Sequence, residues 1–387
     1  MNKSNIPAIR FAGFTDPWEQ RKLKDVADSF EYGLNAAAKE FDGTNKYLRI
    51  TDIDDASRAF SDDDLTSPDT DLATADNYRL QNGDVLFART GASVGKSYIY
   101  RESDGRVYFA GFLIRARIKP ENSAEFVFQN TLTSQYEKYI LITSQRSGQP
   151  GVNAQEYGEY SILMPDYSEQ EKIGDFLRKI DNLITLHQRK YESLMQIKKS
   201  MLRKMFPCEE SRYPEVRFAG FTDAWEQRKL GEIVTVFSGR DYKHLSEGSI
   251  PVYGTGGYML SVSEALSYNQ DAIGIGRKGT IDKPYVLKAP FWTVDTLFYA
   301  VPEHSECLDF VYDVFQIIDW KKKDESTGVP SLSKEAINNT DVMAPNTDEQ
   351  LVIGSFFTRI DHLITLHQRK YETLQRVKKS LLQKMFV

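Results

Sequence analysis

The feature that most constrains this chain is an internal repeat, because part of the first half of the sequence is written again in the second half. Three stretches recur: Arg10-Phe-Ala-Gly-Phe-Thr-Asp16 as residues 217–223, Trp18-Glu-Gln-Arg-Lys-Leu23 as residues 225–230, and Leu183-Ile-Thr-Leu-His-Gln-Arg-Lys-Tyr-Glu192 as residues 363–372. Identities of this length do not arise by chance. The chain is therefore built from two related halves.

The two copies are spaced unevenly along the 387 residues. The first stretch recurs after 207 residues (217 − 10) and the last after 180 residues (363 − 183), so the region between them is 27 residues longer in the first half. Near-identical frames therefore enclose two inserts that differ in length and sequence. This layout is typical of one scaffold that presents two specificities.

The last part of each frame predicts a long helix. Residues 169–206 match residues 349–386 at about 25 of 38 positions, and prolines stand at the edges of these segments. Apolar residues recur every seven positions, which favours supercoiled, paired helices over isolated surface helices. At 1.5 Å per residue each helix would span about 57 Å, which suits a rigid spacer. His187 and His367 lie within the apolar stripe, and we expect packed side chains there rather than metal ligands.

Between the frames, the pattern changes to short β-like runs separated by turn residues. The predicted strands are residues 83–87, 97–100 and 112–118 in the first insert and residues 250–253, 271–275 and 296–301 in the second. A helix is predicted over residues 124–141. The sequence therefore predicts an α/β protein with two mixed domains, each followed by a long helix. The predicted boundaries are residues 1–167 and 207–347 for the domains and residues 168–206 and 348–387 for the helices.

Two pairs of Gly-rich loops show weak sequence similarity between the two inserts. Residues 89–96 align with residues 277–283, and residues 147–153 align loosely with residues 326–331. Exposed backbone N–H groups and basic or hydroxyl side chains in such loops suit contacts with phosphates and base edges. Ordinary hairpin loops have the same composition and remain the alternative. The candidate DNA contacts are Arg89, Thr90, Ser93, Lys96, Arg146 and Gln149 in the first insert and Arg277, Lys278, Thr280 and Lys283 in the second.

The amino-acid composition narrows the classes of protein to which the chain can belong. Apolar residues make up 41% of the chain, which is enough to fill cores. No apolar run approaches the roughly 18 residues of a transmembrane helix, so no membrane is expected as a partner. The two cysteines, Cys208 and Cys307, have no metal-binding spacing, so a reduced, cytoplasmic protein is the simplest interpretation. The net charge of −6 argues against nonspecific coating of DNA, and we expect the acidic stretch 52–76 to face away from any phosphate backbone.

No motif predicts catalytic or metal-binding residues. Residues 91–97 resemble a phosphate-binding loop, but they have three residues between the glycines where that motif needs four. The chain has no Pro-Pro pair, so it lacks the Asn/Asp-Pro-Pro-aromatic signature of adenine methyltransferases. Pro165-Asp166 is not followed by the Glu-x-Lys of a nuclease motif. We therefore expect a non-catalytic protein that holds no cofactor of its own.

The twin Arg-Phe-Ala-Gly-Phe-Thr-Asp and Trp-Glu-Gln-Arg-Lys-Leu blocks, the loop 83–96 and the twin helices together resemble the specificity subunits of type I restriction–modification enzymes. The resemblance covers about Arg10 to Phe386. It implies that each insert is a target-recognition domain that reads one half of a bipartite, asymmetric DNA site. It also implies that the two helices pair antiparallel, with pseudo-twofold symmetry, and fix the gap between the half-sites.

The same resemblance implies the partners. They are double-stranded DNA, two methyltransferase subunits that use S-adenosylmethionine, and restriction subunits that use ATP and Mg. The second insert departs from the loop pattern at Asp282, where a Gly is expected. The competing hypothesis is a coiled-coil scaffold that binds only proteins, and the Gly-rich basic loops argue against it. A self-sufficient nuclease or methyltransferase is disfavoured because its motifs are missing.

Overall fold

The structure is a computed structural model that describes residues 5–146, 148–208, 211–324 and 326–387. The chain forms two compact units: unit 1 comprises Met1–Arg189 and Gln368–Val387, and unit 2 comprises Lys190–His367. Each unit therefore contains one insert, the beginning of one long helix and the end of the other. The boundaries predicted from the sequence separate each long helix from its domain. These four predicted segments stay a prediction.

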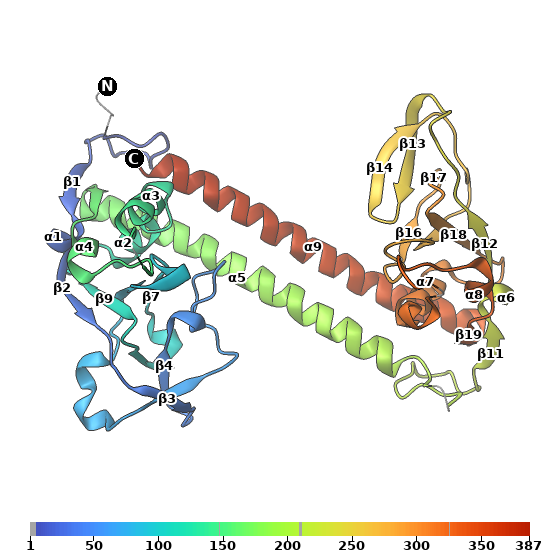
Figure 1. Ribbon diagram of the computed structural model, residues 1–387, viewed down its shortest axis with the longest axis horizontal. Coiled ribbons are helices and arrows are strands. Elements are labelled where there is room, and N and C mark those ends of the chain that lie inside the picture. Colours follow the sequence, from blue (N-terminus) through green and yellow to red (C-terminus); the bar gives the residue numbers. More distant parts are fainter. Residues whose placement is uncertain (1–4, 147, 209–210, 325) are drawn as a thin grey trace. The chain divides into compact units, whose positions relative to one another are not determined.

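Unit 1 holds the first insert (Figure 1). Its elements are β1 (Glu19–Lys22), α1 (Leu23–Val26), β2 (Ala27–Tyr32), β3 (Ala37–Glu40), β4 (Asn45–Leu48), β5 (Thr66–Asp69), β6 (Val85–Ala88), β7 (Ser97–Ile99), β8 (Arg106–Phe109), β9 (Leu113–Ile118), α2 (Ala124–Asn130), α3 (Ser134–Thr143), α4 (Ala154–Gly158), β10 (Ser161–Met164) and the first part of α5 (Tyr167–Lys204). Short 3₁₀ turns occupy Ile50–Asp52, Leu72–Thr74, Asp76–Tyr78, Gly91–Ser93 and Glu102–Asp104.

Unit 2 holds the second insert. Its elements are β11 (Glu226–Lys229), α6 (Leu230–Ile233), β12 (Val234–Ser238), β13 (Glu247–Gly254), β14 (Gly257–Val262), β15 (Ala272–Gly276), β16 (Tyr285–Leu287), β17 (Trp292–Thr293), β18 (Leu297–Pro302), α7 (Leu308–Ile317), a 3₁₀ turn (Trp320–Lys323), α8 (Lys334–Asn338), β19 (Asp341–Ala344) and the first part of α9 (Thr347–Met385).

The repeat extends into the inserts as a shared sheet topology. Unit 1 has a four-stranded antiparallel sheet in the order β2-β9-β6-β7, and unit 2 has the same sheet in the order β12-β18-β15-β16. A two-stranded sheet closes each frame, β1 with β10 and β11 with β19. A parallel pair also recurs, β4 with β8 and β13 with β17. The two inserts are therefore variants of one α/β fold, as the sequence predicts.

The repeated frame residues fix where each long helix begins. Arg10 donates two hydrogen bonds of 2.7 Å to the carboxylate of Glu169, which is fully buried, and the indole of Trp18 donates to the same carboxylate at 3.3 Å. Arg217 donates two hydrogen bonds of 2.7 Å to Glu349 in unit 2. A buried carboxylate needs such a bidentate partner. The twin sequence blocks are therefore structural clamps on α5 and α9.

The next helix residue joins the frame to the insert. The side chain of Gln170 donates to the carbonyl of Pro165 at 2.9 Å and accepts from the backbone N–H of Ser123 at 2.9 Å. Gln350 likewise accepts from the backbone N–H of Cys307 at 3.1 Å. These bonds make Ser123 and Cys307, which precede α2 and α7, equivalent residues. One Glu-Gln pair per unit therefore ties the long helix to both the frame and the insert.

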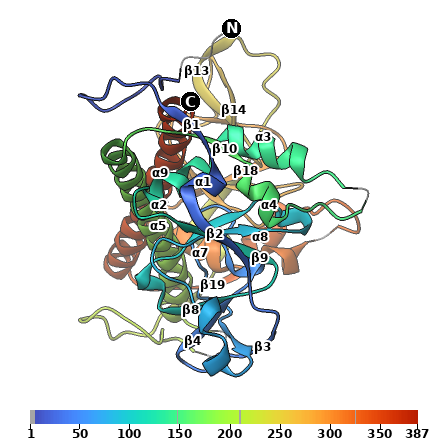
Figure 2. The same cartoon turned by 90° about the vertical axis from the view of Figure 1, so that its left-hand side faces the viewer.

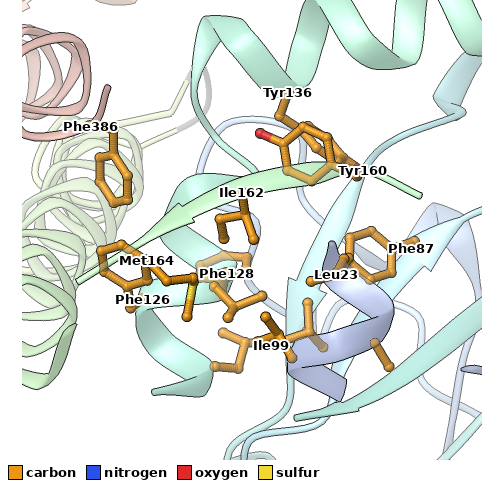
Figure 3. Close-up of a cluster of buried hydrophobic side chains, with 14 of the residues drawn as sticks. Leu23, Phe87, Ile99, Phe126, Phe128, Tyr136, Tyr160, Ile162, Met164 and Phe386 are labelled. Atoms are coloured by element: carbon orange, nitrogen blue, oxygen red, sulfur yellow. The ribbon is translucent and has the colours of Figure 1, made fainter. Parts of the chain in front are cut away.

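The C-terminal end of each long helix packs into the core of the unit that does not contain its beginning. The end of α9 packs in unit 1, and the end of α5 packs in unit 2. In unit 1 the ring of Phe386 lies 5.1 Å from that of Phe126 (Figure 3). It also lies 6.2 Å from the ring of Trp18. In unit 2 Phe206 stacks on Phe310 at 5.5 Å. Each buried ring contributes about 1.5–3 kcal/mol. Figure 2 shows α2, α5 and α9 together on one side of β2, which matches the apolar cluster of unit 1 to which these three helices contribute.

Within each unit the long helices run antiparallel, and an ion pair joins them. Lys378 binds Asp181 at 2.5 Å in unit 1, and Lys198 binds Asp361 at 2.5 Å in unit 2. The buried residues of the predicted apolar stripe are Ile173, Leu177, Ile180, Ile184 and Met385 in unit 1 and Met205, Ile353, Phe357, Ile360 and Ile364 in unit 2. The predicted helix pairing is confirmed within each unit. No helix of the described residues has an apolar stretch sufficient to cross a membrane.

The single helix predicted over residues 124–141 is wrong. Two helices, α2 and α3, replace it because the hydroxyl of Thr131 donates to the carbonyl of Phe128 and the hydroxyl of Thr133 caps α3 by accepting from the N–H of Tyr136. Threonine competes with the helical backbone for these bonds, so it favours helix ends over helix interiors. All six predicted strands are present, with boundaries shifted by a few residues.

Candidate nucleic-acid interface

Three segments that lie far apart in the sequence meet at the loop after β6 in unit 1. The backbone N–H of Arg89 donates to the carbonyl of Phe112 at 3.0 Å, and the N–H of Gly91 donates to Pro150 at 3.0 Å. The N–H of Val152 returns a hydrogen bond to the carbonyl of Arg89 at 2.9 Å. The loop after β6, the turn before β9 and the loop before α4 therefore form one backbone-bonded cluster, which we call cluster 1.

Unit 2 builds the same cluster from different residues. The N–H of Arg277 donates to the carbonyl of Thr296 at 2.8 Å, and the N–H of Gly279 donates to Pro330 at 2.8 Å. The N–H of Leu332 donates to the carbonyl of Arg277 at 3.0 Å. These segments form cluster 2. The predicted alignment of both loop pairs is confirmed, since the same three hydrogen bonds recur at the aligned positions.

Each cluster holds an arginine in a defined place. The guanidinium of Arg89 lies 4.9 Å from the centre of the Tyr32 ring, and its Nη1 donates to the carbonyl of Gly111 at 3.5 Å. Nη1 of Arg277 donates to the carbonyl of Asp295 at 3.4 Å. A guanidinium carries five N–H donors, so one bond to the protein leaves several for a ligand. A held arginine suits bidentate contact with a base edge or a phosphate.

Two further candidates join Arg89 in cluster 1. Thr90 pairs with Gly151 in an isolated β-bridge. The side-chain nitrogen of Gln149 lies 3.1 Å from the place that a Cβ on residue 91 would take. Gly91 has a φ of +78°, a backbone conformation that favours glycine. Ser93 ends the 3₁₀ turn of the same loop.

The structure gives Lys96 a different role from the predicted DNA contact. Its side chain is only 8% exposed, and its Nζ donates to the carbonyl of Ile53 at 3.0 Å and binds Asp55 at 2.5 Å. The hydrogen bond from Lys96 lowers the pKa of Asp55. The ammonium is used inside unit 1, because burial without a partner would be costly. Lys96 therefore anchors the Gly-rich loop instead of facing a ligand.

Arg146 lies at the edge of cluster 1 and is also engaged within the protein. It forms an ion pair with Glu156 and donates to the carbonyl of Thr143 at 2.8 Å. Its side chain is 40% exposed. Ser147, the first residue of the predicted second loop, lies outside the described residues.

The candidate DNA contacts of unit 2 differ in exposure and in their distance along the chain from cluster 2. Lys278 is exposed and pairs with Ser331 in the bridge that matches the Thr90 bridge. Lys283 is exposed on the loop between β15 and β16, whereas Thr280 is half-buried where its carbonyl approaches Gly276. Lys278 therefore belongs to cluster 2, and Lys283 and Thr280 follow it along the chain.

Sequence reasoning missed the turn that completes each cluster. Phe112, predicted as the first residue of a strand, lies just before β9 and is 65% exposed. Asp295 is exposed at the equivalent turn of unit 2. A signal was present, because Gly111 directly precedes Phe112 and glycine before a strand marks a turn. Among the described residues, no group of three or more His, Cys, Asp or Glu side chains could hold a metal ion.

Comparisons with known proteins agree with this architecture. The model of the family "Type I restriction modification DNA specificity domain" matches residues 15–196 and 222–376. The putative type I restriction enzyme MjaX specificity subunit of Methanocaldococcus jannaschii is 21% identical, over 98% of this chain and 95% of that protein. The MjaVIII specificity subunit of the same organism is 21% identical over 78% of each chain.

A solved structure shares the fold. The crystal structure of the type I restriction–modification S subunit from M. genitalium covers 99% of both chains with a TM-score of 0.75 and 16% sequence identity. The family model matches the two halves of the repeat separately, and each match contains one of the loop clusters. The chain therefore belongs to the type I restriction–modification DNA specificity family.

Proposed function

We propose that the chain is the DNA specificity subunit of a type I restriction–modification system and that each unit reads one half of a bipartite, asymmetric site. One observation carries the proposal: two units of one repeat hold an arginine in the same three-segment cluster, with different side chains around it. A shared backbone places the clusters on DNA in the same manner. The different side chains give each half-site its own sequence.

The long helices suit the role of a spacer. The helix α5 is continuous over 38 residues and therefore rises about 57 Å. Half-sites about one helical turn apart lie about 34 Å apart along the duplex, a span that such a helix covers. The net charge of −6 is tolerable if partner subunits supply part of the contact with the phosphates.

The helix surfaces support two equivalent docking sites for methyltransferase subunits. Apolar side chains that are 37–50% exposed recur at matching positions: Leu183, Leu186 and Val377 in unit 1 and Leu363, Leu366 and Ile197 in unit 2. Exposed apolar groups that recur in this way favour protein partners over solvent. If this assignment is correct, Leu363→Lys with Leu366→Lys reduces the complex from two methyltransferase copies to one, as measured by native mass spectrometry.

The chemistry belongs to the partners in this proposal. Methyltransferase subunits supply S-adenosylmethionine, and restriction subunits supply ATP- and Mg-dependent translocation and cleavage. The chain itself has no catalytic role, so the isolated protein is expected to show neither methyl transfer nor DNA cleavage. Both cysteines are free thiols, which fits the proposed cytoplasmic location.

Selection from random DNA tests the proposal. The chain is mixed with its methyltransferase subunits and a library of random duplexes, and bound DNA is sequenced after several rounds. We expect two short blocks of fixed sequence that flank a gap of fixed length. Bound DNA without any enriched sequence, or no binding beyond that of the methyltransferase alone, would instead favour the protein-binding scaffold.

A further inference from the structure

The turns before β9 and β18 occupy the same place in the two clusters. Residues 110–112 form the turn in unit 1 and residues 294–296 form it in unit 2. The glycine that faces each turn, Gly33 or Gly239, donates its N–H to the first residue of the following strand at 3.1 Å in both units. The hydrogen bonds that link the turns to Arg89 and Arg277 also match. The two turns can therefore be compared residue by residue.

The two turns share one backbone conformation and differ in their side chains. Gly111 corresponds to Asp295, and Phe112 corresponds to Thr296. The Phe112 ring is 65% exposed, whereas Thr296 is half-buried and Asp295 is exposed. Each residue lies next to an arginine that both units share. The arginine alone cannot distinguish two half-sites, so side chains next to it must do so.

The exposed ring of Phe112 contributes little to the core of unit 1. An aromatic side chain stabilises a fold through the apolar surface that it buries, and most of this ring stays in contact with solvent. Beside an arginine that faces DNA, the same ring can contact the methyl group of thymine or enter a base step. A carboxylate one residue earlier on the same turn, as at Asp295, would accept a hydrogen bond from a base amino group.

We propose that this turn is a specificity loop: Phe112 reads one base pair of the first half-site by apolar contact, and Asp295 reads one base pair of the second by accepting a hydrogen bond from a base amino group. The inference rests on the proposed function, since it requires that both clusters face DNA. It adds residues that recognise bases next to those contacted by Arg89 and Arg277.

Binding of the assembled complex to single-base-pair variants of its own site tests the inference. Phe112→Ala should weaken binding to the native site by about tenfold and abolish discrimination at one base pair of the first half-site only. Asp295→Ala should abolish discrimination at one base pair of the second half-site only. Ile142→Ala, which changes a side chain that is 70% exposed on α3 of unit 1, serves as the matched control and should change neither value.

An exchange of the turn provides a gain-of-function variant. Gly111→Asp with Phe112→Thr places the second turn in unit 1, and the backbone accepts it because the nearest atom to a Cβ on residue 111 is the carbonyl oxygen of Leu34 at 3.4 Å. We expect the exchanged complex to prefer a different base pair at the same position of the first half-site, with the rest of the site unchanged.

The outcomes separate this inference from the proposed function. If the Phe112 and Asp295 variants keep full discrimination, or lose affinity equally for all sequences, the specificity loop is contradicted although the complex still recognises its site. If the unmodified complex shows no preference among the duplexes, the proposed function itself has failed. Circular dichroism of each variant confirms that folding is unchanged.

Discussion

Arg89 and Arg277 are the residues on which recognition depends most in this account. Each is fixed by a carbonyl of the adjacent turn, so its guanidinium is oriented before DNA arrives. Arg89→Ala should lower affinity by roughly 1–3 kcal/mol and relax one position of the first half-site. Arg277→Ala should do so in the second. Arg106→Ala, an exposed arginine of unit 1 outside cluster 1, is the control. If each variant lost affinity equally for every DNA sequence, the arginines would contact phosphates and not bases.

Asp313 makes the stability of unit 2 depend on pH. Burial raises the pKa of this carboxyl group to about 9, and its Oδ2 has no hydrogen-bond partner. The folded chain therefore keeps a proton that the unfolded chain releases above about pH 4. The free energy of unfolding should fall as pH rises from about 4 to about 9, by up to about 1.4 kcal/mol per pH unit, and level off above that.

Asp313→Asn should remove this dependence. The amide keeps the shape of the acid and resembles Gln129, which takes the equivalent place on α2 and donates to Asp181 at 2.7 Å. Urea unfolding at pH 6 and 8.5, followed by tryptophan emission, measures the effect, because three of the four tryptophans lie in unit 2. The prediction is wrong if the free energy of unfolding changes equally between pH 6 and pH 8.5 in the unmodified protein and in the variant.

At the scale of elements, the Arg10–Glu169 clamp should hold the first turns of α5. Arg10→Ala leaves a buried carboxylate without its cation, which costs about 3–5 kcal/mol. Hydrogen exchange should then accelerate in residues 167–176, and Arg217→Ala should have the same effect at the start of α9. Arg178→Ala breaks only an exposed pair with Asp175 and should change little. Equal exchange in the Arg10 and Arg178 variants would contradict the role of the clamp.

The sequence predicts elements better than it predicts their contacts. A 38-residue periodic pattern located α5 to within two residues, and loop alignment located both clusters, because periodicity and repetition are local or internal signals. The burial of Lys96 and the exposure of Phe112 depend on segments far away in the chain. Asp55 and Ile53 capture the lysine, and Gly33 and Arg89 fix the turn that exposes the ring. No local pattern encodes such pairings.

At the scale of the whole molecule, the length of the paired helices should set the gap between half-sites. Seven residues inserted after both Arg189 and His367 keep the apolar stripe in register and lengthen each helix by about 10 Å, or about three base pairs. The gap should widen by that amount with the bases unchanged. Four residues added after Pro207 should leave the gap unchanged, because Phe206 is already packed in unit 2. If that control widened the gap, the segment after Pro207, and not the paired helices, would set the distance between the half-sites.

Each insert is expected to read its own half-site from a common frame. The most direct test replaces residues 24–160 with residues 231–340, so that both frames carry the second insert, and maps methylated adenines in a genome that also carries the methyltransferase gene. We expect an inverted repeat of the second half-site with the original gap. Persistence of the first half-site, or a change in the second, would contradict this expectation.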